Sequence, residues 1–328
     1  MKKIKIAICG YGNLGKGVEL ALKNNLDMEL VGVFTRRNPD SIETIFDDTK
    51  VYSIKEVNNM KGKIDVMVLC GGSATDLPVQ TPEIASMFNV VDSFDNHANI
   101  EKHFDNVNQA SKDNNTLALI SCGWDPGLFS LNRALFEAVL PNGTNYVFYG
   151  RGLSQGHSDA IRRIEGVKKA VQYTVPYEES VKKVKNGEEP QFSSVREVMW
   201  RECFVVLEEG ADANKIEKEI KEMPNYFEPY NTEVHFISEE EFDKNHIGMP
   251  HGGFVLRSGK TGENTKQIAE FSLNLESNPE FTASVLVACA RAVYKLSKEG
   301  KTGALTVLDI PIAYLTNKTK KELLNSTL

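Results

Sequence analysis

A glycine-rich segment near the start of the chain constrains the fold more than any other feature. An apolar run with the length of a buried strand, residues 3–9, precedes this segment. Leu14, Val18 and Leu22 have the spacing of one helix face, so a predicted helix begins within the end of the segment. The segment consists of Gly10, Tyr11, Gly12, Asn13, Leu14 and Gly15. Glycines at these spacings permit a tight turn, close approach of a pyrophosphate and close helix–strand packing. The pattern predicts the first strand–loop–helix unit of a dinucleotide-binding fold; the alternative is a glycine turn that serves packing alone.

Strand and helix signals alternate through the first third of the chain. Four further apolar runs end in turn residues, namely residues 30–34, 64–70, 89–94 and 116–121. Strands that alternate with helices form a parallel sheet with helices on both faces. We therefore expect an α/β fold in which residues 1–122 form a Rossmann-type, doubly wound parallel sheet.

The pattern changes after Cys122, and 328 residues is a length typical of two domains. Residues 128–139 show a helical pattern, and Ile161, Ile164, Val167 and Val171 have the spacing of a second helix. Strand-like runs occupy residues 203–207 and 233–237, and a hairpin pair occupies residues 254–257 and 267–275. We expect residues 123–276 to form an α+β domain with an open antiparallel sheet. The last long helix, about residues 279–296, is apolar almost all round, which predicts burial between the domains.

The end of the second predicted strand bears on the choice of cofactor. NAD-binding folds usually carry an acidic residue there, which binds the ribose hydroxyls. This strand instead ends in Thr35, Arg36 and Arg37. Guanidinium groups form bidentate bonds with a 2′-phosphate, which a carboxylate would repel. The predicted cofactor is therefore NADP; the alternative is that both arginines are ordinary surface charges.

Three loops follow predicted strands at the sheet edge where doubly wound folds bind ligands. They contain Gly71, Gly72, Ser73, Ala74, Thr75 and Asp76; then Asp95, Asn96 and His97; then Gly123, Trp124, Asp125, Pro126 and Gly127. Of the first loop, Gly72, Ser73, Ala74 and Thr75 are the predicted cofactor contacts. The first suits a nicotinamide ribose, and the others bring carboxylates to the same edge. Asp125 could instead be a helix N-cap followed by proline, and Asp95 could cap a turn. Trp124 could serve core packing.

Two glycine-rich loops occur in the second half of the chain. Residues 150–159 offer backbone amides that could hold a carboxylate, or they form a turn between domains. His251 lies in the loop of residues 248–253, where a satisfied or exposed histidine is the alternative. The six histidines show no metal-binding spacing, and no nucleophile signature is present. These patterns favour redox chemistry carried by a nicotinamide and no metal.

Charge and cysteine content exclude several classes of partner. The net charge is −7, so binding to nucleic acid or to an anionic membrane surface would need a local basic patch. The one dense cluster, Lys318 with Lys320 and Lys321, is expected to be a solvated face. No apolar run is long enough to span a bilayer. Five scattered cysteines without a CxxC spacing predict neither zinc site nor disulfides, and a cytoplasmic location.

Longer motifs occur along essentially the whole chain. In order they are GYGNLG, GSATD, DNH, GWDPG, GLSQGHSDA with the following AVQYT, RECFVV, GMPHGG, NPEFTAS and LTVLDI. Together they resemble those of the meso-diaminopimelate dehydrogenase family, and the set is far more specific than the glycine motif. The resemblance implies NADP-dependent oxidative deamination at the D-configured carbon of meso-2,6-diaminopimelate. The products would be L-2-amino-6-oxopimelate, ammonia and NADPH, and the reverse reaction would serve lysine and cell-wall biosynthesis.

The resemblance also implies a domain organisation. Members of the family are homodimers with a nucleotide domain, a dimerisation region and a substrate region. Residues 123–276 would then bind substrate and the partner subunit, and residues 277–328 would return to complete the nucleotide domain.

Roles at the reacting D-centre follow from the same resemblance. Asp95 and Asp125 would hold the amino group, with Trp124 and Tyr149 as pocket walls. Hydride leaves carbon only once the amine is neutral, so nearby carboxylates would accept the proton and stabilise the iminium cation. Water then attacks, and Asp95, Asp125 or His157 could assist.

The remaining substrate residues would fix the two carboxylates and the far end of the substrate. They are Gln155 and Gly156, through their backbone, for the carboxylate at the D-centre, and Thr174, Arg201, His251 and Asn278 for the distal L-centre. Family members often carry tryptophan or phenylalanine in place of Tyr149, and some carry methionine in place of Gln155. These departures put in doubt how tightly the pocket excludes other D-amino acids.

Two other functions are compatible with a nucleotide-binding fold. One is another Rossmann reductase of aspartate-family metabolism, acting on homoserine or dihydrodipicolinate, although the later motifs do not suit those families. The other is a redox sensor that binds NADP without turnover, which would have no need of the carboxylates, Arg201 and His251.

Overall fold

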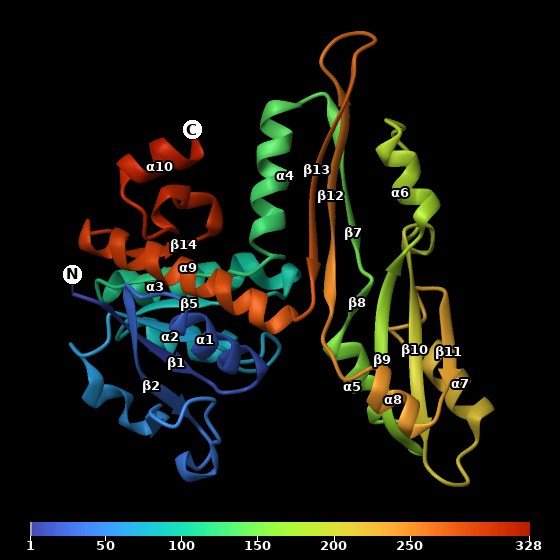
Figure 1. The fold of residues 1–328 in the computed structure, drawn as a ribbon, viewed down its shortest axis with the longest axis horizontal. Coiled ribbons are helices and arrows are strands. Elements are labelled where there is room, and N and C mark those ends of the chain that lie inside the picture. The colour runs from blue at the N-terminus through green and yellow to red at the C-terminus, as the bar shows by residue number, and fades with distance from the viewer. Residues whose placement is uncertain (1) are drawn as a thin grey trace. The chain divides into compact units, whose positions relative to one another are not determined.

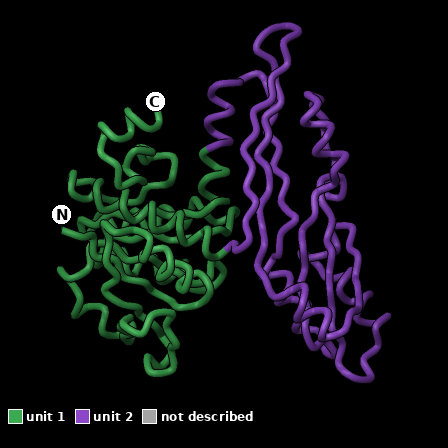
Figure 2. Tube along the Cα trace, in the orientation of Figure 1, with its two compact units in different colours: residues 1–131, 279–328 green, residues 132–278 purple. Residues whose placement is uncertain are grey.

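The computed structural model describes residues 2–328, which form two compact units (Figure 2). In the described part of the chain, unit 1 consists of residues 2–131 and 279–328, and unit 2 of residues 132–278. Each unit has its own sheet structure and its own apolar core. Within the described residues all five cysteines are free, and no helix is long and apolar enough to cross a membrane.

Unit 1 is built on a seven-stranded parallel sheet (Figure 1). Its strands are β1 (Ile4–Cys9), β2 (Met28–Thr35), β3 (Val51–Ser53), β4 (Val66–Leu69), β5 (Asn89–Asp92), β6 (Leu117–Leu119) and β14 (Gly303–Leu305). They follow the order β14-β6-β5-β4-β1-β2-β3, with parallel pairing throughout. The strand order reverses between β1 and β4, and this switch point is where doubly wound sheets form a ligand crevice.

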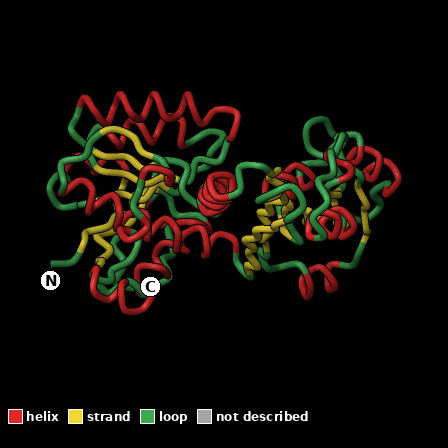
Figure 3. Tube along the Cα trace, turned by 90° about the horizontal axis from the view of Figure 1, so that it is seen from above, coloured by secondary structure: helices red, strands yellow, loops and turns green. Residues whose placement is uncertain are grey.

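Helices cover both faces of this sheet (Figure 3). The helices of unit 1 are α1 (Asn13–Lys23), α2 (Leu77–Ala85), α3 (Ile100–Asp113), α9 (Asn278–Lys298) and α10 (Lys320–Thr327), with 3-10 turns at Pro39–Ser41, Ile54–Met60, His97–Asn99, Val307–Asp309 and Ile312–Tyr314. Ile6 and Ile8 of β1 pack in the core that contains α1 and α9, whereas Ala7 and Cys9 pack in the core that contains α2 and α3. Two-sided burial explains the continuous apolar runs. The predicted Rossmann-type α/β fold is confirmed.

Helix α9 is apolar on most sides because it lies in the core of unit 1. Leu286, Val287 and Val293 are fully buried in this core. On the same helix the buried Arg291 donates to both carboxylate oxygens of Asp27, at 2.6 and 2.8 Å. The expectation that this helix is buried between domains is therefore corrected, since its apolar residues form the core of a single unit.

Unit 2 contains two sheets where the sequence predicted one. Their orders are β11-β10-β9-β8 and β13-β12-β7. The strands are β7 (Gly143–Tyr149), β8 (Gly152–Leu153), β9 (Val167–Pro176), β10 (Met199–Leu207), β11 (Thr232–Phe236), β12 (His251–Lys260) and β13 (Lys266–Leu275). The helices are α4 (Leu128–Val139), which begins in unit 1, α5 (Gln155–Arg162), α6 (Glu178–Lys185), α7 (Ala213–Lys221) and α8 (Glu239–Asn245), with a 3-10 turn at Val195–Glu197. The β12–β13 hairpin is confirmed, and β10 pairs with β11 in parallel, so the first sheet is mixed.

The helical pattern predicted through Val171 is wrong. Helix α5 ends at Arg162, and both Val167 and Val171 belong to β9. Gly166 separates the two elements: its φ is +88°, and an added Cβ would lie 2.9 Å from that of Ala211. Because β9 is an interior strand buried along most of its length, it lacks the apolar–polar alternation of a half-exposed strand.

Candidate active site

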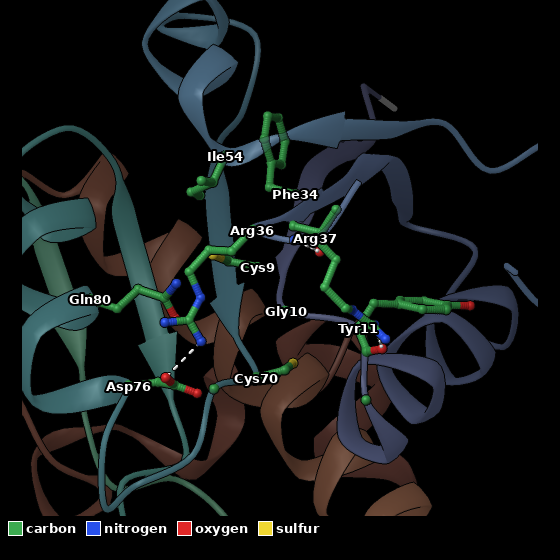
Figure 4. A pocket seen from close by; sticks show the side chains of 13 residues that line it. Cys9, Gly10, Tyr11, Phe34, Arg36, Arg37, Ile54, Cys70, Asp76 and Gln80 are labelled. Carbon is green, nitrogen blue, oxygen red and sulfur yellow. Dashed lines mark hydrogen bonds and ion pairs between the residues drawn. The ribbon is translucent and has the colours of Figure 1, made fainter. Parts of the chain in front are cut away.

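A pocket of about 390 Å³ in unit 1 lies at the carboxyl ends of β1, β2 and β4 (Figure 4). It is lined by Cys9, Gly10, Tyr11, Gly12, Phe34, Thr35, Arg36, Arg37, Ile54, Cys70, Gly71, Asp76 and Gln80. Six of these residues were predicted as cofactor contacts: Gly10, Tyr11, Gly12, Thr35, Arg36 and Arg37. The pocket lies at the switch point of the sheet, which is a position that suits a dinucleotide.

The glycines between β1 and α1 are required for different reasons: one for its backbone conformation, one for close packing and one for open space at the start of the helix. Gly10 has a φ of +92°, a conformation that favours glycine. A Cβ on Gly15 would lie 2.3 Å from the carbonyl oxygen of Gly10, so this glycine is required for close packing within the motif itself. A Cβ on Gly12 would meet no atom of the chain within 4 Å. The absence of a side chain there leaves the start of α1, with Asn13 and Leu14 in its first turn, accessible to a phosphate.

The two arginines after β2 have different partners. Arg36 Nη2 lies 2.6 Å from Oδ1 of Asp76, as Figure 4 shows. Arg37 Nη2 donates to the carbonyl oxygen of Tyr11 at 2.7 Å, and its backbone N donates to Thr35 Oγ1 at 3.1 Å. Both arginines line the pocket, where their charges would be available to an anionic group.

Asp76 and Gln80 are polar pocket residues for which no contact was predicted: Asp76 ends the first predicted loop but was given no role, and Gln80 was not singled out. Asp76 Oδ2 accepts from the backbone N of Gly72 at 3.0 Å, and this bond, together with pairing to Arg36, lowers the pKa of the carboxyl group. Gln80 Oε1 is buried and has no hydrogen-bond partner within residues 2–328. The sequence signal was weak, because acids beside loops and glutamines within helices are common in soluble proteins that bind no nucleotide.

The other pocket residues for which no contact was predicted are Cys9, Phe34, Ile54, Cys70 and Gly71, of which Gly71 begins the first predicted loop. Burial raises the pKa of the Cys9 thiol to about 12, so this part of the wall is uncharged at neutral pH. Cys9, Phe34 and Cys70 each lie one residue before a predicted motif, so extending the motifs by one residue would have found these three, whereas Ile54 lies away from all of them.

A buried carboxylate on α1 holds one side of the pocket. Glu19 is 1% exposed and accepts from the hydroxyl groups of Tyr11 and Thr49. It also accepts from the backbone N of Ile45 at 3.1 Å. Glu19 therefore ties the glycine loop to the segment of residues 45–49. Nothing in the local sequence distinguishes this glutamate from a surface one.

The three loops predicted for the catalytic crevice follow three strands of the same sheet. Gly72, Ser73, Ala74 and Thr75 follow β4; Asp95, Asn96 and His97 follow β5; and Gly123, Trp124, Asp125, Pro126 and Gly127 follow β6. Ser73 connects the first two loops, because its Oγ accepts from the backbone N of Asp95 at 3.1 Å and donates to the carbonyl oxygen of Ser93 at 3.4 Å. All three loops therefore emerge at the same sheet edge.

Neither acid occupies the position directly before the helical segment that follows its loop. Helix α4 begins three residues after Asp125. Asp95 lies before the N-cap residue of the 3-10 turn at residues 97–99. Trp124 is 7% exposed and packs edge to face on Phe129, with 5.1 Å between ring centroids. The packing role considered for Trp124 is confirmed.

A buried guanidinium group marks a separate polar site in unit 2. Arg201 of β10 is 6% exposed and donates through Nη1 to Thr174 Oγ1 on β9, directly opposite in the strand pairing. Its guanidinium carbon lies 3.8 Å from the ring centroid of Tyr230. Burial lowers the pKa of Arg201, and its Nε has no hydrogen-bond partner in the described part of the chain. A buried cation with an unmet donor is an arrangement that a carboxylate satisfies.

Two histidines share this environment. Burial, followed by the charge of Arg201, lowers the pKa of His157 to about 4; burial also lowers the pKa of His251, to which Arg201 contributes. The His251 ring fills the space beside Gly152, where an added Cβ would meet its Nδ1 at 2.4 Å. Gly152 in turn pairs with Thr174. The structure therefore brings Thr174, Arg201 and His251 together.

The remaining predicted substrate residues of unit 2 lie around Met249 or at a strand end. Gln155 Nε2 lies 3.2 Å from Sδ of Met249, and the backbone N of Asn278 donates to the carbonyl oxygen of Met249 at 2.9 Å. Gly156 follows in the first turn of α5. Tyr149 ends β7, opposite a glycine of β12.

The fold and the pocket define the chain as a dinucleotide-binding protein of the Rossmann type, and the following comparisons make it an NADP-dependent oxidoreductase. The family model described as "Diaminopimelic acid dehydrogenase C-terminal domain" matches residues 123–277, and a meso-diaminopimelate D-dehydrogenase from Ureibacillus thermosphaericus is 61% identical over 323 residues, 98% of each chain. The chain belongs to the meso-diaminopimelate D-dehydrogenase family.

Solved structures of related proteins share the whole fold. The C. glutamicum DAP dehydrogenase, solved in complex with DAP, is 43% identical and matches over 100% of both chains with a TM-score of 0.91. An engineered D-amino acid dehydrogenase bound to NADP+ is 41% identical and also matches over 100% of both chains, with a TM-score of 0.86. The likeness therefore extends through both units.

Proposed function

We propose that this protein oxidises meso-2,6-diaminopimelate at its D-centre, with NADP as the acceptor. The D-configured carbon loses hydride and its amino group, water supplies the new carbonyl oxygen, and the products are L-2-amino-6-oxopimelate, ammonia, NADPH and a proton. The reaction is reversible, and its reverse builds meso-diaminopimelate for lysine biosynthesis.

The observation that carries this proposal is identity along the full length of the chain. The Ureibacillus thermosphaericus enzyme is 61% identical over 98% of both chains. The buried, unsatisfied Arg201 adds support, because a substrate with two carboxylates offers the partner that this side chain needs. A redox sensor without turnover, or another reductase of aspartate-family metabolism, has no supporting observation of this kind.

The pocket of unit 1 fits NADP at two places. The open start of α1 suits the pyrophosphate, which Gly10 to Gly15 would hold, and Arg36 with Arg37 would hold the 2′-phosphate. The loops after β4, β5 and β6 would contact the nicotinamide end. When bound, NADP supplies the acceptor for hydride.

Asp95 and Asp125 are proposed to act at the reacting amino group. Deprotonation of the ammonium group must precede hydride loss, because only a neutral amine can donate its lone pair to the carbon that becomes cationic. A carboxylate within hydrogen-bond reach accepts that proton and then stabilises the positive charge on the iminium group. Trp124 and Tyr149 would shield this centre from bulk water.

Selection of the D-centre requires that the other end of the substrate be held. Both ends carry one amino and one carboxylate group, so only fixed placement can distinguish them. Backbone groups at Gln155 and Gly156 are proposed to bind the carboxylate next to the reacting carbon. The distal L-centre would be bound by four side chains, those of Thr174, Arg201, His251 and Asn278.

The function is tested with the three stereoisomers of the substrate. Purified protein is mixed with NADP and, in separate assays, with meso-, L,L- or D,D-diaminopimelate, and NADPH formation is followed by absorbance at alkaline pH. We expect a rapid rise with the meso isomer and none with the L,L isomer, which has no D-centre. The absence of any rise with the meso isomer would refute the proposal.

The residue roles are tested by two variants with opposite expected effects. Arg201→Lys keeps the charge but loses the fork of donors, so KM for meso-diaminopimelate should rise about tenfold or more with little change in kcat. Asp125→Asn removes a proton acceptor, so kcat should fall about 100-fold with a smaller change in KM. Arg257→Lys is the matched control, because Arg257 is buried in unit 2 and donates to the backbone oxygens of Leu140 and Pro141. Unchanged kinetics in both site variants would contradict these assignments.

We also propose that the enzyme is a cytoplasmic homodimer. Helix α4 carries apolar side chains that are exposed in the single chain, including Leu135 at 55% and Val139 at 65%, and such a face suits a protein partner. Five free cysteines suit a reducing compartment. Light scattering after size exclusion should give twice the chain mass; a monomer at micromolar concentration would contradict the dimer.

A further inference from the structure

Asp92 is a buried carboxylate that has hydrogen-bond partners on several segments of unit 1. It is the last residue of β5 and is 0% exposed. Both carboxylate oxygens and the backbone oxygen accept hydrogen bonds from other parts of unit 1. A buried charge is costly unless it is fully bonded, and here each oxygen is occupied.

One carboxylate oxygen holds the chain where it leaves two adjacent strands. Asp92 Oδ1 accepts from the backbone N of Phe94 at 3.1 Å and from the backbone N of Ser121 at 2.8 Å. The carbonyl oxygen of Asp92 accepts from Cys122 N at 2.9 Å. Phe94 is the residue immediately before Asp95, and Ser121 and Cys122 lead directly into the loop that contains Asp125.

The backbone that Asp92 holds after β6 is strained. Ser121 has a φ of +56°, in the left-handed region that non-glycine residues rarely adopt. Such a conformation persists only where the surrounding contacts determine it. The bond from Ser121 N to Asp92 is one of these contacts, and it fixes the direction in which the chain enters the Asp125 loop.

The second oxygen fixes the orientation of the carboxylate itself. Asp92 Oδ2 lies 2.6 Å from Nε2 of His103 on α3 and accepts from Thr81 Oγ1 on α2 at 2.8 Å. His103 is 3% exposed, and its ring stacks on that of Phe94 with a centroid distance of 4.1 Å. The carboxylate thus links two helices to the two loops.

We propose that Asp92 is a positioning residue for the reaction: through backbone bonds after β5 and β6 it sets the relative placement of Asp95 and Asp125. This inference rests on the roles proposed above for those two acids. Both acids lie on loops of unit 1, and loops hold a geometry only as well as their supporting contacts do. A catalytic carboxylate displaced by about 1 Å can lose on the order of a hundredfold in rate, so a fixed anchor matters for turnover.

The experiment compares a graded series at Asp92 with a partly buried carboxylate elsewhere in unit 1 that also holds a buried partner. Asp92→Asn keeps one acceptor for the two backbone amides but presents an NH₂ group towards His103 and Thr81, and Asp92→Leu removes both acceptors. Asp27→Asn is the control, because Asp27 is bonded to the buried Arg291 just before β2 begins, at the opposite end of the sheet from these loops.

In the stereoisomer assay kcat should fall about tenfold in Asp92→Asn and further in Asp92→Leu, while KM for NADP changes by less than about threefold. Asp27→Asn should lower the melting temperature by a similar amount to Asp92→Asn and leave kcat unchanged. His103→Phe keeps the ring against Phe94 but loses the bond to Asp92, and it should lower kcat less than Asp92→Asn does. A kcat of Asp92→Asn within twofold of the wild type, or an equal loss in Asp27→Asn, would overturn the proposal.

A second readout does not depend on activity. Hydrogen exchange at the backbone amides of Phe94, Ser121 and Cys122 should be faster in Asp92→Asn than in the wild type, with no change at these amides in Asp27→Asn. If the wild type lacks activity, the proposed function fails while this measurement still tests the anchor. Unchanged exchange at Phe94 and Ser121 would refute the anchor even in an active enzyme.

Discussion

The charge of His157 is set by its surroundings in unit 2. Its Nδ1 lies 2.8 Å from Ser154 Oγ, and its ring packs edge to face against Tyr226 and Phe227. Burial lowers its pKa to about 4, and the charge of Arg201 acts in the same direction. The imidazole is therefore neutral at pH 7. A base of such low pKa is a poor proton acceptor, which favours Asp95 or Asp125 over His157 as the group that assists water.

The same pKa predicts how stability depends on pH. Between the ordinary value of 6.5 and about 4, the unfolded chain binds a proton at this position and the folded chain does not. The contribution of neutral His157 is thus fully present above pH 6.5 and is lost as the pH falls to about 4, at most about 3 kcal/mol.

This dependence is measured by urea unfolding of the wild type and of His157→Gln at pH 7.5 and 4.5. The loss of unfolding free energy on acidification should be smaller in the variant by about 1–3 kcal/mol. His97→Gln serves as the control, since His97 is exposed. An identical pH dependence in wild type and His157→Gln would show that the buried histidine is not the source.

Single residues were predictable where their role depends on their sequence neighbours. Arg36 and Arg37 were found because they replace an acid at a known place in a known motif. The roles of Asp76 and Asp92 were not predicted, because they arise from contacts with residues far along the chain. Arg36 lies 40 residues from Asp76, and Ser121 lies 29 residues from Asp92. No local pattern distinguishes such carboxylates from ordinary turn residues.

Two glycines of the loop between β1 and α1 have different roles: Gly15 is needed for stability, and Gly12 is proposed to leave room for the phosphate. An alanine at position 15 would place its Cβ 2.3 Å from the carbonyl oxygen of Gly10, so Gly15→Ala should destabilise unit 1 by about 1–3 kcal/mol. An alanine at position 12 meets nothing within 4 Å of the chain. Gly12→Ala should keep the melting temperature of the wild type but bind NADP about tenfold more weakly or worse, because its Cβ occupies the phosphate side of the loop.

Both variants are compared by thermal unfolding without nucleotide and by NADPH fluorescence titration. Stability should change at position 15 and affinity at position 12. If Gly12→Ala binds NADPH as tightly as the wild type, the loop does not hold the pyrophosphate in the way proposed.

Helices and strands whose apolar residues follow a clear helical or strand pattern were predicted well. Helix α4 occupies the predicted residues 128–139, and the five strands expected in the first third of the chain correspond to β1, β2, β4, β5 and β6. The short strands β3 and β14 were not predicted. Interior strands of unit 2 were harder. The residues of β9 imitate a helical spacing because both faces are buried. No strand was predicted at β7 or β8, although Pro141, Asn142 and Gly143 form a turn signal at the start of β7.

For the molecule as a whole, composition and periodicity indicated the fold class but not the substrate. The pairing of Arg201 with Thr174 depends on the register of β9 against β10, which the sequence pattern did not predict. Those two residues were predicted only from the resemblance of motifs along the chain. The structure adds what the motifs lack: a buried cation with an unmet donor, in a unit separate from the nucleotide pocket.

The proposed reaction requires that hydride leave the D-centre of meso-diaminopimelate and pass to NADP. Substrate that carries deuterium only at the D-configured carbon reports on this step alone. Mass spectrometry of the products should find one deuterium in NADPH and none left at the new carbonyl carbon. Unlabelled NADPH, with deuterium retained in the amino acid, would contradict the proposed reaction.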